Sequence, residues 1–401
     1  MANKLRLKTV NITGFKSLES FEIAFDGNIN LMIGPNGAGK STVLQFFSFL
    51  HAFILGEPQR FFDERGWNTK QIRGFFSRSS NIIATLMFES DLGEVIWHLN
   101  WGLQSKVTRG EWLQYKKNDE TVTVFRVSSD GKQVKYNGQT VEHLRIPGSV
   151  LAVLDLTSSA LDPESTAIVK SLEEWGTGIF SLELMSPAAM RRGTRVVSPH
   201  IGHRGELLAG FLASLNSSQK SELVQKIGKF FPSISKLNTT RKRAGWVDLK
   251  IAENFPRSGE FSANHISDGL LRIIALISIS EFALDTSLIL LDEVEDGIDP
   301  HILPGILEDI QRESSISILM TSHSPILVNL FPPESISFVA RTDDGPAVTA
   351  RFDEIREIQK DLEFEGTGEI WLHTSPETIK KWVISAQNNK PHHDAISEGS
   401  L

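Results

Sequence analysis

The segment GPNGAGKS, residues 34–41, constrains the fold of this chain more than any other feature. It follows the apolar run INLMI, predicted as a buried strand, and precedes TVLQFFSFLHAFI, predicted as a helix. A glycine-rich turn of the form G-x-x-x-x-G-K-[ST] between a strand and a helix is typical of a phosphate-binding loop, or P-loop. The pattern therefore predicts an α/β core built around such a loop.

The residue types of this loop match the needs of a nucleotide phosphate. Its glycines let backbone amides curl around phosphate oxygens, and the start of the helix adds the positive end of its dipole. We expect Lys40 to bridge the outer phosphates and Ser41 to ligate Mg²⁺. The residues predicted to bind the nucleotide here are Asn36, Gly37, Ala38, Gly39, Lys40, Ser41 and Thr42.

A second apolar strand ends in two adjacent carboxylates, in SLILLDEVEDGIDP, residues 287–300. Asp292 stands at the carboxyl end of the strand, where it is placed to hold Mg²⁺ beside Ser41. Glu293 is suited to polarise an attacking water. An acidic pair that merely ends a strand at the surface is the alternative, and the P-loop favours the catalytic interpretation.

A third strand, in ISILMTSHSP (residues 316–325), leads to His323. Ligands of open α/β sheets bind at the carboxyl ends of the strands, which puts His323 within reach of a terminal phosphate or the attacking water. A lone histidine at this place is more often structural. The two neighbouring motifs favour a catalytic role.

The turn HISDGLLR, residues 265–272, precedes an apolar helix. Ser267 and Asp268 are suited to cap that helix, and Gly269 permits close approach of the backbone to a ligand. The alternative to capping is that this helix end faces a phosphate. A second anion site is redundant for one nucleotide unless it serves the nucleotide of another subunit.

The remaining periodicity suggests four parts. Strands are predicted over residues 5–33, 82–89, 94–99, 122–127 and 150–156, and helices over 165–175, 206–215 and 218–230. From residue 264 helices and strands alternate, as expected of parallel strands with crossover helices. The expected domains are an N-lobe with a mixed sheet around the P-loop (1–160), a helical or insert subdomain (161–260), a C-lobe (261–386) and a disordered tail (387–401).

Composition excludes several classes of function. A net charge of −8 argues against coating nucleic acid through bulk positive charge, and the absence of cysteine excludes disulfides and thiolate zinc sites. The first residues lack the apolar core of a signal peptide, and the most apolar window, 270–292, is broken by charges. We therefore expect a cytoplasmic protein that does not span a membrane.

GPNGAGKS, HISDGLL, LILLDE and TSHS, in this order, resemble the motifs of the ABC-type ATPase family that includes SMC proteins and RecF. In that family two heads face each other head to tail and sandwich ATP between the P-loop of one and the signature turn of the other. The resemblance implies the same ATP and Mg²⁺ chemistry and a homodimer or higher oligomer. The implied roles are signature residues Ser267 and Gly269, magnesium ligand Asp292, catalytic base Glu293, dimer-facing Asp299 and switch histidine His323.

The opening NITGFKSLESFEI is also similar to the RecF and SMC pattern, which implies that Lys16 and Ser17 help bind the nucleotide. Asp268 and Leu270 depart from the transporter signature and favour the RecF-like branch. Gln71 is the candidate for the family's glutamine after the P-loop. Residues 185–215 and 362–372 resemble RecF-like AAA ATPases of bacterial phage-defence loci.

The implied fold class is α/β: an ABC-type ATPase head with a mixed N-terminal sheet lobe, a P-loop parallel-sheet core and a helical subdomain. The chain shows no heptads for a long coiled coil. Too few residues follow His323 for a Toprim nuclease domain, and no further metal cluster for one is visible. We therefore expect any nuclease or toxin to be a separate chain.

Two basic clusters are candidates for contact with DNA phosphates or an acidic partner. A solvated surface or an arginine beside the nucleotide is the alternative. His392 and His393 lie in the polar tail and carry no predicted role. The clusters are Arg191, Arg192, Arg195, His200, His203 and Arg204, and then Arg241, Lys242 and Arg243.

Three functions remain open at this stage. The first is an ATP-dependent dimeric switch that gates an associated nuclease or toxin in anti-phage defence. The second is a RecF-like repair or maintenance ATPase that acts directly on DNA. The third is an ATP-binding scaffold with little hydrolysis.

Overall fold

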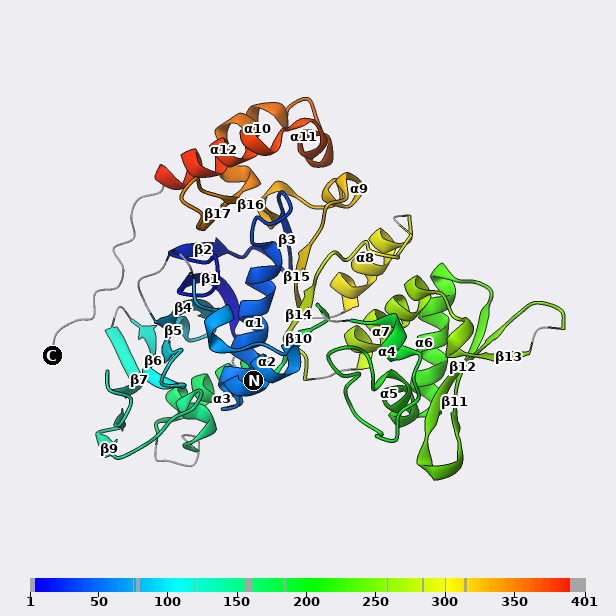
Figure 1. Cartoon of the computed structure of the whole chain (residues 1–401), viewed down its shortest axis with the longest axis horizontal. Coiled ribbons are helices and arrows are strands. Elements are labelled where there is room, and N and C mark those ends of the chain that lie inside the picture. The colour runs from blue at the N-terminus through cyan, green and yellow to red at the C-terminus, as the bar shows by residue number, and fades with distance from the viewer. Residues whose placement is uncertain are drawn as a thin grey trace.

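Helix α1 (Lys40–Ile54) packs against two β-sheets in this computed structural model (Figure 1). Its apolar residues touch the first sheet through pairs such as Phe49 with Trp101 and Phe53 with Trp97. The structure describes residues 4–74, 76, 80–118, 120–155, 161–183, 185–257, 259–282, 285–299, 301–313 and 316–389.

The first sheet is antiparallel throughout and has the order β2-β1-β4-β5-β6-β7-β8-β9. Residues of its strand over 81–90 alternate between buried and half-buried, as expected of a sheet with one covered face. The strands are β1 (Arg6–Thr13), β2 (Phe21–Ala24), β4 (Asn81–Ser90), β5 (Gly93–Gly102), β6 (Val107–Lys117), β7 (Glu120–Val127), β8 (Val134–Tyr136) and β9 (Gln139–Val141).

The second sheet has the order β10-β14-β15-β3-β16-β17 and is parallel except for its last strand. Strand β3, which precedes the P-loop, belongs to this sheet, whereas the other N-terminal strands, predicted with it in one mixed sheet, form the separate antiparallel first sheet. Its strands are β3 (Ile29–Ile33), β10 (Ile179–Ser181), β14 (Leu288–Leu291), β15 (Ser317–Thr321), β16 (Ile336–Arg341) and β17 (Ala347–Arg351).

This second sheet separates two hydrophobic cores. Leu288 and Leu290 of β14 point into the core shared with α1, whereas Ile289 and Leu291 point into the other. All five residues of β3 are buried, because helices or strands cover both faces of the sheet. The continuous apolar runs that predicted these strands reflect this double burial.

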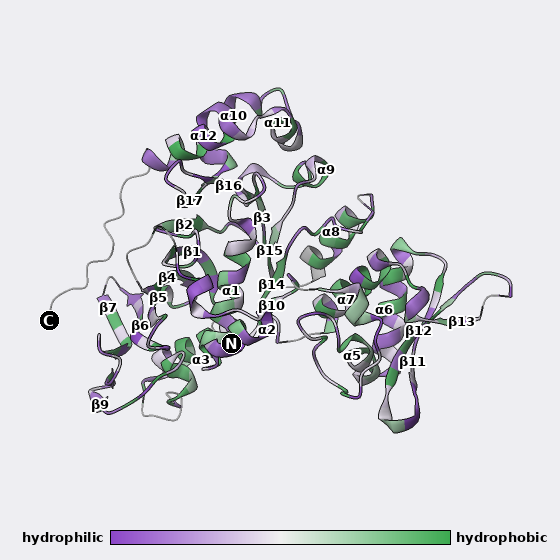
Figure 2. Cartoon of the chain, viewed as in Figure 1, coloured by the Kyte–Doolittle hydropathy of each residue, from purple (hydrophilic) through white to green (hydrophobic). Residues whose placement is uncertain are grey.

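Helices cover the second core and the top of the molecule in Figure 1. Figure 2 shows α10 as almost wholly hydrophilic. The other helices are α2 (Pro58–Arg65), α3 (Pro163–Thr177), α4 (Pro187–Met190), α5 (Leu208–Ser214), α6 (Ser217–Phe230), α7 (Asp268–Phe282), α8 (Leu303–Glu313), α9 (Pro325–Val328), α10 (Arg356–Asp361), α11 (Thr367–His373) and α12 (Pro376–Asn388). The 3-10 helices are η1 (Thr69–Gln71), η2 (Val150–Ala152), η3 (Arg243–Gly245), η4 (Ala263–His265), η5 (Pro333–Ser335) and η6 (Phe352–Glu354).

A third, antiparallel sheet of three strands packs on α5 and α6. Its strands are β11 (Ile234–Arg241), β12 (Val247–Glu253) and β13 (Glu260–Ser262), and the hairpin β11–β12 extends beyond the helices in Figure 1. The region predicted to be helical therefore also contains strands. The sequence carries a signal for β12, since its apolar residues Val247, Leu249 and Ile251 alternate with less buried ones as in a half-buried strand.

The strand expected over residues 150–156 is wrong. The chain forms η2 instead, because the buried Glu111 carboxylate accepts hydrogen bonds from the Val150 amide and the Ser149 hydroxyl. The Ser149 hydroxyl also caps the turn by accepting from the Leu151 amide at 3.2 Å. These contacts to a residue far away in the sequence are invisible to a local pattern.

The end of the chain differs in part from the expected tail. Helix α12 continues through Asn388, so it includes two residues of the range 387–401. Residues 390–401, with His392 and His393, lie outside the described residues. Within the described chain, no helix combines the length and apolar character needed to cross a membrane.

Candidate functional site

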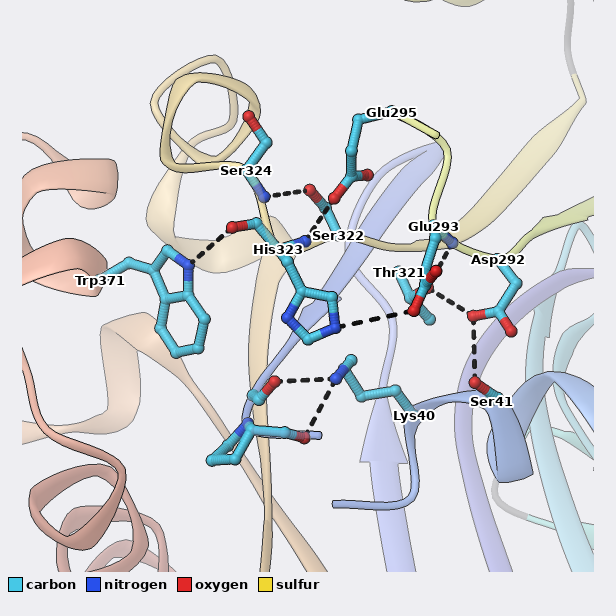
Figure 3. Close-up of polar contacts among 12 residues, drawn as sticks. Lys40, Ser41, Asp292, Glu293, Glu295, Thr321, Ser322, His323, Ser324 and Trp371 are labelled. Carbon is cyan, nitrogen blue, oxygen red and sulfur yellow. Dashed lines mark hydrogen bonds and ion pairs between the residues drawn. The ribbon is translucent and has the colours of Figure 1, made fainter. Parts of the chain in front are cut away.

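Three segments that carry the predicted motifs meet at one edge of the second sheet (Figure 3). Strand β15 pairs in parallel with both β14 and β3, so the carboxyl ends of all three lie together. The P-loop follows β3, Asp292 follows β14, and His323 follows β15. The order of strands alone thus brings residues separated by most of the chain to one site.

Lys40 is held within the P-loop. Its buried Nζ donates to the carbonyl oxygens of Gly34, at 2.8 Å, and Pro35, at 3.2 Å. Burial lowers the pKa of Lys40, and the carboxylates of Asp292, Glu293 and Glu295 oppose that shift. The charge of the lysine is therefore balanced by acids at the ends of the neighbouring motifs.

Ser41, Asp292, Thr321 and Glu293 form a continuous chain of hydrogen bonds. The hydroxyls of Ser41 and Thr321 both donate to Oδ1 of Asp292, at 3.1 and 2.6 Å. The Thr321 hydroxyl also accepts from the backbone amide of Glu293 at 2.8 Å. Thr321 is fully buried, whereas Ser41 and Asp292 are half-buried. Thr321 is the first residue of the TSHS motif, and no role is predicted for it from the sequence.

Glu293 has an unusual backbone. Its φ of 46° lies in the left-handed region, which costs a non-glycine residue about 1–3 kcal/mol. The bond from its amide to Thr321 accompanies this conformation, and the side chain is 59% exposed. The Glu293 carboxylate takes no part in this hydrogen-bond network, and a water molecule has access to it.

The backbone of His323 is held from two sides. Its amide donates to Oε1 of Glu295 at 2.6 Å, and its carbonyl accepts from the indole of Trp371 at 3.4 Å. Sequence reasoning missed both partners. The sequence signals for these partners are weak. Glu295 lies in the acidic run EVED, and Trp371 lies in the segment 362–372, which resembles other ATPases.

The imidazole of His323 faces the carboxylate of Glu293, with 3.9 Å between Nε2 and Oε1. Burial lowers the pKa of His323, Lys40 lowers it further, and the nearby carboxylates oppose the shift. The neutral imidazole is therefore favoured at neutral pH. A neutral imidazole at this position adds no charge beside the Glu293 carboxylate.

The two N-terminal candidates are placed differently. Ser17 is buried, its hydroxyl has no hydrogen-bond partner among the described residues, and it lies 3.1 Å from where a Cβ on Gly39 would be. Lys16 instead donates to Oε1 of Gln45 at 2.7 Å and lies 3.7 Å from the centre of the Trp67 ring. Burial lowers the pKa of Lys16 to about 8. Ser17 therefore borders the P-loop with an unused donor, whereas Lys16 is engaged by protein groups.

The turn over residues 265–272 has the capping geometry. The Ser267 hydroxyl accepts from the Leu270 amide at 3.3 Å, at the start of α7. Asp268 pairs with Arg191, which also donates to the carbonyl of Ile266 at 2.7 Å. In the described chain, no hydrogen bond or ion pair connects this turn with the P-loop.

Gly269 is needed for packing within the chain. A Cβ on this glycine would lie 2.1 Å from the carbonyl oxygen of Gly297. The sequence predicts that Gly269 lets the backbone approach a ligand. In the structure this glycine lets the backbone approach the loop after β14. Arg272 of the same helix pairs with Asp296 of that loop at 3.1 Å. The turn and the acidic motif therefore form one unit.

The remaining candidates have simpler environments. Gln71 accepts from the Asn68 amide at 2.7 Å and so caps η1, and Asp299 accepts from the His301 amide at 2.9 Å. The other P-loop residues range from exposed (Asn36, Gly37) through half-buried (Gly39, Thr42) to buried (Ala38). Capping explains Gln71 without a nucleotide.

The donors at this site fit a nucleotide phosphate with Mg²⁺. In the part of the chain that is described, no cluster of three or more His, Asp or Glu side chains is arranged to hold a metal ion. Mg²⁺ usually takes one or two carboxylates together with substrate phosphates and water. The oxygens of Ser41 and Asp292, beside a loop that ends in a buried lysine, meet this requirement.

Residues 29–329 match the family described as "AAA domain, putative AbiEii toxin, Type IV TA system". No curated protein matches the chain. The SMC head domain from Thermotoga maritima is 13% identical, with 86% of this chain and 98% of that chain covered and a TM-score of 0.47. The SmcHead bound to the C-winged helix domain of ScpA is 14% identical, with 86% and 97% covered and a TM-score of 0.49.

A third similar structure is the Smc head domain with an extended coiled coil, bound to the C-terminal domain of ScpA, from Pyrococcus furiosus. It is 12% identical, with 90% of this chain and 100% of that chain covered and a TM-score of 0.51. This likeness concerns the fold alone. It confirms the predicted fold class, an ABC-type ATPase head like that of SMC proteins.

Proposed function

The chain belongs to the AAA-domain family of the AbiEii-toxin type, and on this premise we propose that it hydrolyses ATP with Mg²⁺ and acts as a dimeric switch. Closure of two heads on ATP would regulate a separate nuclease or toxin in defence against phage. The observation that carries the proposal is the hydrogen-bond chain from Ser41 through Asp292 and Thr321 to Glu293, with His323 beside it.

Each residue of this hydrogen-bond network, together with Lys40 and His323, is assigned a part in the proposed reaction. ATP supplies the phosphoanhydride bond, and Mg²⁺ offsets the charge of its phosphates. Lys40 and the P-loop amides bind phosphate, and Ser41 and Asp292 provide the metal's oxygen ligands. Glu293 accepts a proton from the attacking water at its exposed carboxylate, and neutral His323 lies beside that carboxylate, with its Nε2 3.9 Å from Oε1.

Replacing Glu293 by Gln tests the hydrolytic role. We expect kcat to fall by about 10²–10⁴-fold, the usual contribution of a general base, while ATP binding persists. Asp296→Asn is the control, because it removes one negative charge from the same loop and affects the ion pair with Arg272, outside the hydrogen-bond chain of the site. An unchanged kcat in Glu293→Gln would refute the role and favour an ATP-binding scaffold with little hydrolysis.

Head-to-tail dimerisation is the second part of the proposal. It is supported by the turn at Ser267, whose helix start makes no hydrogen bond or ion pair with the P-loop of its own chain among the described residues. Ser267→Arg in the Glu293→Gln background should bind ATP normally and remain monomeric in sedimentation velocity. Ser375→Arg is the control and should dimerise. It also removes a helix cap, because the wild-type Ser375 hydroxyl accepts from the Thr378 amide. Dimerisation of Ser267→Arg on ATP would exclude the proposed interface.

The family description names a putative toxin of a toxin–antitoxin system, which supports a role in such a system, and we propose that the toxic activity belongs to a separate chain. Affinity purification from the native host, with and without ATP and infection, would identify the partner by mass spectrometry. We expect a nuclease or toxin chain with the wild type and its loss with Ser267→Arg. A wild-type protein that purifies alone under every condition would contradict this part of the proposal.

A further inference from the structure

Two basic segments that are distant in the sequence are joined in the fold. Thr194 and Val247 form an isolated bridge, in which the Thr194 amide donates to Val247 at 3.0 Å and the Val247 amide donates to Thr194 at 2.7 Å. The first residue follows Arg191 and Arg192, and the second begins β12 just after the turn of the hairpin. The two predicted basic clusters therefore share one surface.

Tight packing fixes the first segment on the hairpin. A Cβ on Gly193 would lie 2.1 Å from Oδ1 of Asp248 and 2.8 Å from the Val247 carbonyl oxygen. On its other side, the Val196 carbonyl oxygen lies 2.0 Å from where a Cβ on Gly210 of α5 would be. The segment is thus held between a helix and a strand, and its side chains are presented on a rigid backbone.

The side chains at this junction are cationic and aromatic. The guanidinium of Arg195 lies 5.1 Å from the ring centre of Trp246, which is 41% exposed. This distance is within the range of a cation–π contact, and it orders both side chains. We call the exposed set the basic hairpin patch: Arg192, Arg195, Arg241, Lys242, Arg243 and Trp246.

The positive charge of this patch is mostly uncompensated. Lys242 pairs with Asp248, whereas its four arginines form no ion pair with any described residue. Such a concentration is unusual in a chain with a net charge of −8. Two members of the first predicted cluster, His203 and Arg204, are directed elsewhere, since both contact Glu64.

We propose that the basic hairpin patch binds a single-stranded nucleic acid. Its arginines match the phosphates of a backbone, and the exposed ring of Trp246 offers a face on which a base can stack. This ligand goes beyond the proposed function, which assigns nothing outside the nucleotide site. Arg191, next to the patch in the sequence, holds the signature turn through Ile266 and Asp268, so the bound strand lies beside that turn.

Fluorescence anisotropy of the full chain with labelled oligothymidylate of about 20 nucleotides tests the charges, because site sizes of this class reach about 16 nucleotides. Release of counterions from four arginines predicts a slope of log K against log salt of about −3. Arg241→Glu/Arg243→Glu removes two of the four arginines that would contact phosphates. It should therefore weaken binding at least about tenfold and reduce the slope by about half. Arg356→Glu/Lys360→Glu on exposed α10 makes the same charge change and should leave binding unaltered.

The aromatic contribution is tested separately. Trp246→Ala should weaken oligothymidylate binding about tenfold, as expected for loss of one stacked base, and Trp246→Phe should retain most of it. Duplex DNA should compete less well than the single strand. Polyglutamate should not compete.

Four results would overturn the proposal. They are failure of the wild type to bind at low salt, equal weakening by the α10 control, no effect of Trp246→Ala, and competition by polyglutamate or duplex as strong as that by the single strand. Strong competition by polyglutamate would indicate an acidic protein partner in place of a nucleic acid. Lys40→Ala leaves the patch intact, so it distinguishes failure at this surface from failure of the nucleotide site.

Discussion

Thr321 connects Asp292, the proposed magnesium ligand, to the backbone amide of Glu293, the proposed catalytic base, and its replacement by valine tests whether that connection matters. Valine keeps the shape of the side chain and replaces only the hydroxyl by a methyl group. The change deletes a hydrogen bond to the Asp292 carboxylate, which contributes about 1.5–3 kcal/mol, and one from the Glu293 amide, which contributes about 0.5–1.5 kcal/mol. We therefore expect the nucleotide-free protein to lose about 2–4 kcal/mol of unfolding free energy.

The catalytic effect follows from the freed backbone of Glu293. Because its left-handed conformation costs about 1–3 kcal/mol, loss of the bond to Thr321 lets residue 293 relax away from its position. We expect kcat to fall at least about tenfold, equivalent to 1.4 kcal/mol, and KM for ATP to change much less. Thr321 is thus a positioning residue, distinct from the groups that contact substrate.

Urea unfolding and steady-state ATPase kinetics measure the two effects. Thr321→Ser retains the hydroxyl and should recover kcat. Thr349→Val is the matched control, since Thr349 is a buried residue of the same sheet whose hydroxyl has no hydrogen-bond partner among the described residues. The reasoning is refuted if Thr321→Val keeps the wild-type unfolding free energy and kcat, or if Thr349→Val loses as much as Thr321→Val.

Two further predictions concern stability. Burial raises the pKa of Glu111 from 4.5 to about 7, so its contribution to stability is full below pH 4.5 and declines as the pH rises to about 7. Glu111→Ala should remove a decline of about 3 kcal/mol from urea unfolding curves taken between pH 5 and about 8, and an identical pH dependence would contradict this. Gly269→Ala should destabilise the protein by about 1–3 kcal/mol, because its Cβ would meet Gly297. Gly228→Ala in α6, where a Cβ meets open space, should raise the thermal midpoint instead, and equal effects of the two would refute the packing explanation.

The sequence by itself determined the elements on which the site is built. A P-loop needs only a buried strand, a glycine-rich turn and a helix in direct succession, and the structure has β3 and α1 on either side of GPNGAGKS. The apolar runs before Asp292 and His323 likewise predicted β14 and β15, since strands covered on both faces need apolar residues throughout. Parallel pairing then places the ends of these strands together.

Only the tertiary structure decided which side chains support those elements. Thr321, Glu295 and Trp371 contact the catalytic motifs across long stretches of sequence, and a local pattern carries no signal for such pairs. For the same reason the contact of Glu111 with Val150 turned an expected strand into a 3-10 helix.

The basic hairpin patch also depends partly on the sequence and partly on the tertiary structure. The sequence revealed both clusters of cations, because charge is a property of single residues. Their union depends on the bridge between Thr194 and Val247 and on the close packing of Gly193. Hydrophobic periodicity decides whether a segment forms a helix or a strand, whereas contacts between distant segments decide which residues surround it. Both the nucleotide site and the basic hairpin patch depend on the two together.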